Sequence, residues 1–428
     1  MTARRVILAT FGSDGDVNPF LAIGERLKAL GLTPVLATRE AYRAAALARG
    51  LDFHPLRPDM SDLAQAGLDE QTAVRGLTHP ATGLRFLFKR MVLPFLHMTF
   101  EDLNAVVRAG DLLVHHQLLL AAPIVADHRR LRRLTAVLQP FSLMSPLDPP
   151  VLGMIPWLDA LRPVLPPWVY RRVFKTMAQV SAGWFAPVGA LRESLGLARG
   201  PANPTFNGQM TDQGGLALYS PAFAPLPADA PPGLVQTGFP VLTPASDAGL
   251  DPALEAFLAA GPAPIVFTLG TTAVLDPGAF YRISLAAAER LGRRAVLQVG
   301  ERGREGLPAD LPPSAFAVSY APHALLLPRA LAVVHQGGIG TSAQALRAGR
   351  PQLVVPFLGD QPDNAARLSR LGVALSLARE RHNAASAAKA LDALITAPAY
   401  AQKAETLRLT LADEDGAAAA AAEIARRV

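Results

Sequence analysis

A glycine-rich segment in the C-terminal half has the residue types and spacing of a phosphate site. It reads Val334-His-Gln-Gly-Gly-Ile-Gly-Thr341, with an apolar strand before the glycines and a helix expected to begin near Thr341. Glycines let the backbone approach a ligand closely, and the free N–H groups of a helix N-terminus carry about half a positive charge. We expect a phosphate at Gly337, Gly338 and Gly340, with an empty tight turn as the alternative. The Walker A and dinucleotide patterns are absent here.

Side chains suited to an apolar ligand are concentrated between residues 80 and 200. All three tryptophans of the chain, Trp157, Trp168 and Trp184, lie there among long apolar stretches interrupted by prolines. Pockets for apolar ligands are lined by such side chains together with a few polar groups. The segment therefore indicates either core packing or an apolar pocket, and the pocket residues we expect include Phe141, Trp157 and Trp184.

Alternating strands and helices must position these residues. The apolar patterning predicts parallel sheets covered on both faces by helices, and ligands in such sheets bind beyond the carboxyl ends of the strands. We therefore predict an α/β fold in which two Rossmann-like βαβ domains face a cleft. Strands are expected at 6–10, 33–38, 51–56, 112–114, 264–269, 294–299, 316–319, 332–335 and 352–355, and helices at 20–30, 39–49, 279–291, 340–347, 361–371 and 417–427.

The domain boundaries follow from a stretch rich in proline, alanine and glycine at 221–262. We predict an N-terminal domain at 1–240, a linker at 241–262 and a C-terminal domain at 263–410. A C-terminal helix within 411–428 completes the chain, and its expected partner is the N-terminal domain.

Composition excludes several classes of function. Apolar residues make up 50% and charged residues 18%, which is core-forming composition. The absence of cysteine excludes thiolate nucleophiles, disulfides and cysteine metal sites. No apolar run is long enough to span a membrane, and a net charge of +6 with 6% aromatic residues argues against nucleic acid. We expect a cytoplasmic protein. Arg171, Arg172 and Lys175 leave peripheral contact with the inner face of the membrane open.

Several separated motifs occur in one order along the chain. Tyr320-Ala-Pro-His323, the segment 334–341, Ala348-Gly-Arg-Pro351 and Asp360-Gln-Pro-Asp-Asn364 resemble the donor-binding signature of the family 1 glycosyltransferases, which have the GT-B fold. Within that family the chain looks closest to the bacterial rhamnosyltransferases of rhamnolipid assembly and to related lipid, sterol and natural-product glycosyltransferases. Three further segments resemble the family's other loops: Phe11–Phe20, Thr237–Pro240 and Phe267–Thr271.

The resemblance implies a reaction and two partners. The C-terminal domain would hold a UDP- or dTDP-sugar, for example dTDP-rhamnose or UDP-glucose. A hexose or deoxyhexose would be transferred with inversion to a hydroxyl of a lipophilic acceptor in the N-terminal domain. The alternatives are a nucleotide-sugar isomerase of similar build and a relative that binds nucleotide sugar without turnover.

The resemblance also implies roles at the donor site. Tyr320 would stack on the base, His323 would lie near the base and ribose, and Asp360 with Gln361 would bind hydroxyls of the sugar. His335 and the glycine-rich turn would face the diphosphate. The complete set of expected donor-binding residues is Gly12, Thr271, Tyr320, Pro322, His323, His335, Gln336, Gly337, Gly338, Gly340, Thr341, Gln344, Asp360 and Gln361.

Two positions depart from the family pattern. Gln336 stands where bacterial members carry a second histidine, which removes positive charge near the leaving diphosphate. Ala343 stands where plant members carry a glutamate that binds ribose, and its neighbour Gln344 is the alternative ligand.

Transfer with inversion needs a base that takes a proton from the attacking hydroxyl. The resemblance gives this role to Asp16, with an N-cap of a helix beginning near Pro19 as the alternative and Asn18 as a competitor for that cap. His115 and His116 are second candidates on the acceptor side, with a structural role as the alternative for each.

Asp14 and Asp16 also match the Asp-x-Asp metal motif of a different glycosyltransferase fold. The motif lies in the wrong half of the chain for the donor, and a helix N-terminus already serves the diphosphate. We therefore expect no metal and no other cofactor.

Overall fold

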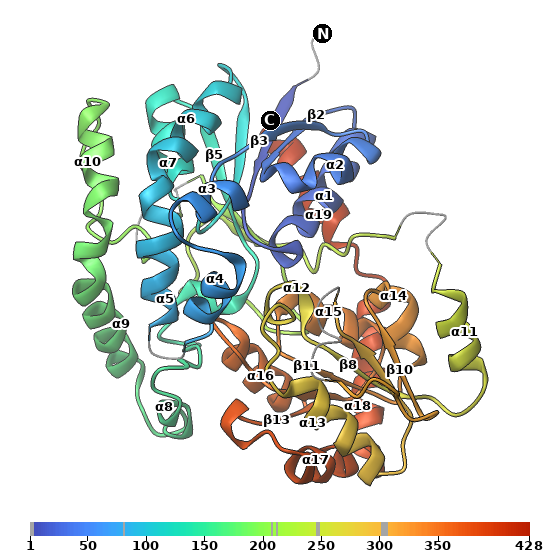
Figure 1. Cartoon of the computed structure of the whole chain (residues 1–428). Coiled ribbons are helices and arrows are strands. Elements are labelled where there is room, and N and C mark those ends of the chain that lie inside the picture. The colour runs from blue at the N-terminus through green and yellow to red at the C-terminus, as the bar shows by residue number, and fades with distance from the viewer. Residues whose placement is uncertain (1–3, 80–81, 207–208, 211–212, 245–248, 301–306) are drawn as a thin grey trace.

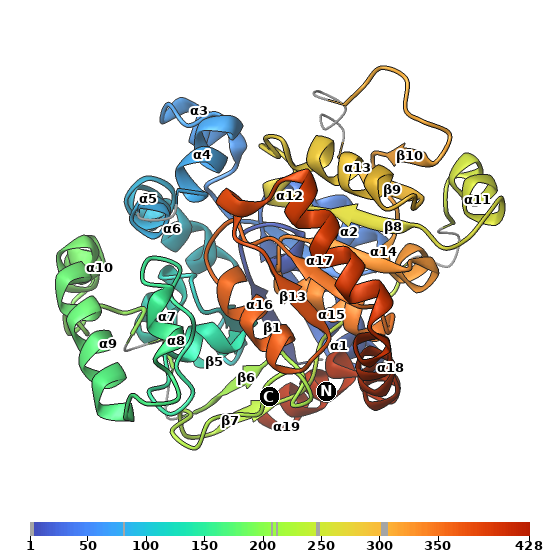
Figure 2. The same cartoon turned by 90° about the horizontal axis from the view of Figure 1, so that it is seen from below.

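The computed structural model describes residues 4–79, 82–206, 209–210, 213–244, 249–300 and 307–428. Two sheets form its framework, one in each half of the chain, and every strand pairing within them is parallel. The N-terminal sheet has the order β3-β2-β1-β4-β5-β6-β7, and the C-terminal sheet has the order β10-β9-β8-β11-β12-β13. The expected α/β class with two βαβ domains is therefore confirmed (Figures 1 and 2).

The central strands are continuous apolar runs because both faces of each sheet are covered. Val6 to Ala9 of β1 and Ala332 to His335 of β11 are fully buried. The strands are β1 (Arg5–Ala9), β2 (Thr33–Thr38), β3 (Asp52–Pro55), β4 (Leu112–His116), β5 (Arg132–Val137), β6 (Gly215–Ala217), β7 (Leu234–Gln236), β8 (Ile265–Thr268), β9 (Ala295–Gln298), β10 (Ala315–Val318), β11 (Ala332–His335), β12 (Gln352–Val354) and β13 (Ala374–Ser376).

Helices cover these sheets and end the chain. Those of the N-terminal half are α1 (Asp14–Ala29), α2 (Arg43–Ala48), α3 (Met60–Gln65), α4 (Glu70–Leu77), α5 (Gly83–Phe86), α6 (Leu96–Val106), α7 (Ala121–Arg129), α8 (Trp157–Ala160), α9 (Pro167–Ser181) and α10 (Ala186–Ser194). Those of the C-terminal half are α11 (Pro252–Ala259), α12 (Gly270–Ala273), α13 (Phe280–Arg290), α14 (His323–Leu326), α15 (Ile339–Arg347), α16 (Gln361–Arg370), α17 (Ala384–Thr396), α18 (Pro398–Ala412) and α19 (Gly416–Arg427). Within the described ranges, no helix is both long and apolar enough to cross a bilayer.

Helix α1 begins six residues before the position predicted from the sequence, at Asp14 instead of Phe20. Ser13 is its N-cap, and the Asp16 carboxylate accepts a hydrogen bond from the Ser13 N–H at 2.9 Å. This capping arrangement stabilises the first turn, so the helix continues through Pro19 instead of starting there. Asp16 and Asn18 are therefore not the N-cap.

The segment expected to be a linker, 241–262, contains a helix. Leu254 and Leu258 of α11 are buried in one cluster with Val266 and Val296 of the C-terminal sheet. The helix therefore packs on the C-terminal domain, and the connection is shorter than predicted. Residues 245–248 of this segment lie outside the described residues.

The chain returns to its first domain at the C-terminal end. Ala420 and Ile424 of α19 are buried in the same cluster as Val17 and Phe20 of α1, and the two helices lie side by side in Figure 1.

Candidate active site

Two strand-to-helix turns meet where the carboxyl edges of the two sheets face each other. One leads from β1 into α1 and the other from β11 into α15. A Cβ atom built on Gly340, in the first turn of α15, would lie 4.0 Å from the Cα atom of Gly15, in the first turn of α1. The N-termini of two helices, one from each domain, are therefore adjacent.

Asp16 and His116 form a pair on the N-terminal side of this junction. The sheet register places Ala9 beside His115, so the residues that follow β1 and β4 are neighbours. The Asp16 Oδ1 atom lies 3.7 Å from Nε2 of His116, and the carboxylate is 34% exposed while the imidazole is 2% exposed. The two candidate bases that the sequence kept separate thus belong to one arrangement.

The imidazole of His116 has a defined tautomer. Its Nδ1 atom accepts a hydrogen bond from the Leu118 N–H at 3.2 Å, so the ring proton is on Nε2, which faces Asp16. Burial lowers the pKa of His116, opposed by the nearby Asp16 carboxylate. The ring is therefore neutral at pH 7, and Nε2 is buried without a hydrogen-bond partner within 3.5 Å.

Gly12 leaves room for the Asp16 carboxylate. Its φ angle is +118°, and a Cβ atom there would lie 2.2 Å from Asp16 Oδ2. The sequence placed Gly12 among the donor-binding residues. Its contacts in the structure instead support the acceptor-side pair.

His115 is not a site residue in this structure, which corrects its place among the acceptor-side candidates. Its Nδ1 atom lies 3.1 Å from the carbonyl oxygen of His116, and its Nε2 atom lies 3.2 Å from Nη1 of Arg133. The side chain is fully buried, and burial lowers its pKa to about 3, assisted by Arg133. These contacts leave His115 a structural role between β4 and β5.

The three expected acceptor aromatics do not line one pocket. Phe141 packs on the cluster that contains Tyr170 and Phe174. Trp184 packs on the core beneath α6 and α7, and Trp157 is 63% exposed. Phe141, Trp157 and Trp184 therefore do not converge on an apolar pocket.

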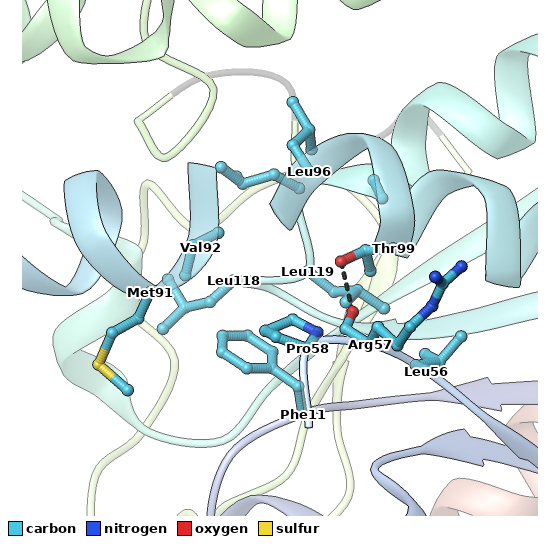
Figure 3. A pocket seen from close by; sticks show the side chains of 12 residues that line it. Phe11, Leu56, Arg57, Pro58, Met91, Val92, Leu96, Thr99, Leu118 and Leu119 are labelled. Carbon is cyan, nitrogen blue, oxygen red and sulfur yellow. Dashed lines mark hydrogen bonds between the residues drawn. The ribbon is translucent and has the colours of Figure 1, made fainter. Parts of the chain in front are cut away.

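A narrow apolar pocket lies elsewhere in the N-terminal domain, beside the Asp16–His116 pair (Figure 3). Phe11 forms part of its wall and also contacts His116 edge-on, with ring centroids 5.9 Å apart. Met91 and Val92 come from the π-helical turn Leu87–Val92. The remaining lining residues are Leu56, Arg57, Pro58, Leu96, Thr99, Leu118, Leu119, Leu120 and Ala121.

The C-terminal turn is held by hydrogen bonds that involve His335. Its Nδ1 atom accepts from the Gly337 N–H at 3.1 Å, and its Nε2 atom donates to Oε1 of Gln352 at 2.9 Å. The ring is fully buried, and burial lowers its pKa to about 4. Both ring nitrogens are therefore engaged inside the protein, so the direct diphosphate contact expected of His335 does not fit this geometry. The ring positions the turn.

Gln336 occupies the space between two loops. Its Nε2 atom would lie 2.4 Å from a Cβ atom built on Gly270 and 2.9 Å from one built on Gly338. Its Oε1 atom is buried without a hydrogen-bond partner. The amide thus sits between the turn that opens α15 and the short helix α12, where the exposed Thr271 also lies.

Glycine is required at Gly337 by both conformation and space. Its φ angle is +91°, and a Cβ atom there would lie 2.7 Å from Val354 Cγ1. Gly338 is the N-cap of α15 and has no side chain to satisfy the first N–H groups. These groups, with Gly340 and Thr341 in the first turn, remain directed at the junction.

The side chains of Asp360 and Gln361 are held by different partners, a side-chain amide for Asp360 and two backbone N–H groups for Gln361. Oδ2 of Asp360 accepts from Nδ2 of Asn364 at 2.6 Å, and the same Nδ2 donates to the Gly337 carbonyl at 2.9 Å. Oε1 of Gln361 accepts from the N–H groups of Phe357 and Leu358 at 2.7 and 3.0 Å. Burial raises the pKa of Asp360 to about 7, and the nearby Asp16 carboxylate contributes to the rise. Asp360 is therefore near enough to Asp16, the candidate base, for the two carboxylates to influence each other.

The residues expected near the base and ribose follow β10 and begin α14. The Tyr320 ring is 70% exposed, which leaves a face free for stacking. Pro322 is the N-cap of α14. Nε2 of His323 lies 3.5 Å from Oγ1 of Thr268, and burial lowers its pKa to about 4. Gln344 is partly buried on α15.

Gln352 and Asn364 are positioning residues, and their contacts were not predicted from the sequence. Gln352 is 17 positions from His335, and Asn364 is 27 positions from Gly337, so each contact depends on tertiary structure. The pocket residues around Met91 were also missed, although the apolar run Met91–Leu96 was a visible signal.

Two Rossmann-like domains whose carboxyl sheet edges face each other are the architecture of the GT-B class of glycosyltransferases. Solved structures share this fold. The crystal structure of the glycosyltransferase VinC in complex with dTDP has a TM-score of 0.67 and 21% identity, and the match covers 99% of this chain and 98% of that one.

Comparisons of sequence give the family. A model of the glycosyltransferase family 28 N-terminal domain matches residues 6–120, and a model of the erythromycin biosynthesis protein CIII-like C-terminal domain matches residues 282–428. The O-mycaminosyltylonolide 6-deoxyallosyltransferase of Streptomyces fradiae is 32% identical over 96% of this chain and 94% of its own length. The vancomycin aglycone glucosyltransferase of Amycolatopsis orientalis is 31% identical over 87% and 85%. The chain belongs to the family of GT-B glycosyltransferases that contains these two natural-product enzymes, and it is a glycosyltransferase.

A more distant relative is a sterol 3-beta-glucosyltransferase of Aspergillus terreus. It is 27% identical over 99% of this chain and 30% of its own length. Family membership favours transfer over the two alternatives, nucleotide-sugar isomerisation and binding without turnover.

Proposed function

We propose that the protein transfers a hexose or deoxyhexose, with inversion, from a UDP- or dTDP-sugar to a hydroxyl of a lipophilic acceptor. The observation that carries the proposal is the junction of the two turns. It places the Asp16–His116 pair next to a helix N-terminus that has no acidic residue in its first turn. An acceptor hydroxyl and a donor diphosphate have separate, chemically matched positions there.

The proposed step needs one base and one anion site. The hydroxyl oxygen attacks the anomeric carbon as its proton passes to Asp16, and the bond from that carbon to the diphosphate breaks on the opposite face. The N–H groups from Gly338 to Thr341 stabilise the leaving diphosphate. The Gln336 amide supplies a neutral donor at the same place. His116 holds the Asp16 carboxylate in position and does not itself take the proton, because Nε2 already carries one.

We propose that the reaction needs no metal. The carboxylates of the Asp14-Gly15-Asp16 motif have separate partners within the N-terminal domain. Asp14 Oδ1 accepts from the Tyr42 hydroxyl at 2.9 Å, and Asp16 Oδ2 accepts from the Ser13 N–H at 2.9 Å. One oxygen of each carboxylate is therefore already engaged by a hydrogen-bond donor of the N-terminal domain.

The lipophilic acceptor is supported by the pocket beside Phe11. Its lining is almost entirely apolar, and the acceptor hydroxyl would emerge toward Asp16. The pocket is narrow, so a large acceptor must displace part of the wall. Met91 is unbranched with three rotatable bonds and is the side chain best able to move. The natural-product and sterol glycosyltransferases among the relatives also favour such acceptors.

The test measures acceptor-dependent release of UDP or dTDP. The donors are UDP-glucose, dTDP-glucose and dTDP-rhamnose, and the acceptors are a sterol, a hydroxyacyl lipid, a polyketide and a hydrophilic sugar. We expect release with at least one lipophilic acceptor, and a product of inverted anomeric configuration by NMR. Val92→Trp, which fills the pocket, should raise the acceptor KM about tenfold or more and leave the donor Kd unchanged. Release only with the hydrophilic sugar, or conversion of the nucleotide sugar without acceptor, would overturn the proposal.

A further inference from the structure

Exposed apolar side chains are concentrated on one part of the N-terminal domain, residues 147–180, which we call the lobe. Among the described residues, seven of the thirteen exposed large apolar side chains fall between Leu147 and Val180. We call Met154, Trp157, Leu161, Val164 and Trp168 the apolar tip; their exposed fractions are 48, 63, 40, 74 and 64%. Scattered apolar residues are ordinary on a protein surface, but a contiguous group marks a contact site.

A basic helix face adjoins the apolar tip. At about 100° per residue, Trp168, Arg171, Arg172 and Lys175 share one side of α9 and are all exposed. The opposite side carries Tyr170 and Phe174, which are buried. The basic face is therefore the outer side of a helix whose inner side is packed on the protein.

The charges of this face are not neutralised by the lobe itself. The sequence has no aspartate or glutamate between Asp159 and Glu193. Within the part of the chain that the structure describes, no acidic group lies within 4 Å of the Arg171, Arg172 or Lys175 cations. The surface therefore combines protruding apolar groups with unpaired positive charge.

The lobe is held firmly to the rest of the molecule. Asp148, just before the apolar tip, pairs with Arg367 of α16 at 2.7 Å, and Arg367 also pairs with the buried Asp363 at 2.8 Å. Oδ1 of Asp363 accepts from the Val151 N–H at 3.0 Å. The apolar tip thus continues from a segment fixed on α16, the helix whose N-cap is Asp360. In both views α9 and α10 line the outer edge of the molecule, opposite α11 (Figures 1 and 2).

We propose that the apolar tip and the basic face of α9 together dock the protein on an anionic lipid bilayer. Tryptophan side chains partition to the headgroup region, where the ring is buried and the indole N–H stays hydrated. Each lysine or arginine near an anionic surface contributes about 1 kcal/mol, which is about a fivefold gain in partitioning. A second copy of this chain would instead bring two basic faces together. The docking itself requires no transfer reaction.

The experiment uses the full chain without donor or acceptor. It is mixed at low salt with vesicles of phosphatidylcholine alone or with one third phosphatidylglycerol, and bound protein is measured by sedimentation. Two of the chain's three tryptophans lie on the apolar tip, so tryptophan emission is a second readout. We expect binding to the anionic vesicles only, a blue shift of the emission, and weaker binding as salt screens the charges.

Two variants and one control make the test specific to this surface. Charge reversal of Arg171, Arg172 and Lys175 to glutamate should weaken binding more than 100-fold, and Trp157→Ser with Trp168→Ser should weaken it at least tenfold. The control reverses Arg293, Lys389 and Lys403, three exposed cations of the C-terminal domain, and should bind like the parent at the same change in net charge. All of these positions are exposed, and an unchanged melting temperature verifies the fold.

Three outcomes would overturn the proposal: no binding of the parent protein at low salt, equal loss of binding in the control, or self-association that the Trp157→Ser/Trp168→Ser variant abolishes. The last outcome would identify the apolar tip as an interface between copies. Because nucleotide release is measured separately in detergent-free solution, failure of docking is distinguishable from failure of the transferase reaction.

Discussion

The turn from β1 into α1 and the turn from β11 into α15 have a similar backbone arrangement. They differ in the charge of the side chains in the first helical turn. Each follows a buried parallel strand, and each helix has a glycine at its second position, Gly15 or Gly340. In α1 the flanking helical residues are Asp14 and Asp16, whereas the first turn of α15 carries no acidic residue. The two domains therefore present the same structural element with opposite preferences for ligands.

The difference explains how one fold element would serve both substrates of the proposed reaction. Carboxylates at a helix N-terminus are stabilised by the dipole and satisfy its N–H groups, so the first turn of α1 suits the proposed base and disfavours a diphosphate. The α15 turn, with Gly338 as an uncharged cap, keeps its N–H groups available to an anion. In the proposed function, a few side chains instead of the fold would therefore assign donor and acceptor to different domains.

Asp16→Asn should have the largest effect, because it removes the proposed base, the carboxylate that lies 3.7 Å from His116. The amide keeps the size and loses the ability to take a proton. We expect kcat to fall about 10²–10⁴-fold, with the Kd for UDP or dTDP unchanged in a thermal-shift titration. A variant that loses nucleotide binding in parallel with kcat would place Asp16 in the donor site instead.

Gly340→Asp should give the first turn of α15 the negative charge that Asp14 and Asp16 give the first turn of α1. Space is available, since only Gly15 lies within 4.0 Å of the new Cβ atom. An acidic side chain near a helix N-terminus stabilises the helix by about 0.3–1 kcal/mol, so the fold should persist. Nucleotide binding should weaken about 100-fold or more, because the new carboxylate repels the diphosphate. Gly340→Ala is the matched control, with a small effect on binding. Equal loss in both variants would show that the glycine serves packing and that charge is not the cause.

Much of the framework could be predicted from the sequence, because buried strands and glycine turns are local signals. Strands β1 and β11 and the start of α15 were expected within one residue of their observed bounds. The start of α1 was missed because Pro19 was given more weight than the Ser13–Asp16 capping pair, which was also a local signal.

The internal contacts of the site were not predictable. The role of His335 depends on Gln352, a partner brought close by the pairing of β11 with β12. The pairing of Asp16 with His116 depends on β1 and β4 being neighbours, although some 100 positions separate the two residues. The apolar pocket combines four separated segments of the chain. Motif spacing identifies which residues reach the edge of a sheet, and tertiary contacts decide which atoms remain free there.

A pH series should distinguish the two carboxylates at the junction, Asp16 and Asp360. Burial raises the pKa of Asp360 to about 7. If its carboxylate form binds sugar hydroxyls, the donor KM should fall about tenfold between pH 6 and pH 8. Asp360→Asn should remove this dependence. An unchanged KM over this range in the parent protein would show that the protonated carboxyl binds the sugar equally well.

Stability gives an independent check on the same group. Asp360 ionises near pH 4 in the unfolded chain, so the folded protein binds one more proton between about pH 4 and pH 7. Its contribution to the free energy of unfolding therefore falls as pH rises through this window and stays lower above it. Asp360→Asn should raise the melting temperature at pH 8 and leave it unchanged below pH 4. A larger gain at low pH would contradict the raised pKa.

Ser13→Ala should give the smallest effect, because it removes one of the two hydrogen bonds from Ser13 to the Asp16 carboxylate and leaves the carboxylate itself in place. The Ser13 hydroxyl donates to Asp16 Oδ2 at 3.3 Å, while the backbone N–H of the same residue remains bonded to that oxygen at 2.9 Å. Loss of an N-cap side chain costs about 1 kcal/mol, so the melting temperature should fall by a few degrees. We expect a two- to fivefold lower kcat with an unchanged nucleotide Kd. The matching position of α15 is already a glycine, so Gly338→Ser should add a cap there and compete with the diphosphate, weakening nucleotide binding. The Gln336 side-chain amide, 2.9 Å from the new Cβ atom, must shift to admit the serine. If Ser13→Ala changed nucleotide binding and Gly338→Ser did not, the assignment of the two turns to acceptor and donor would be reversed.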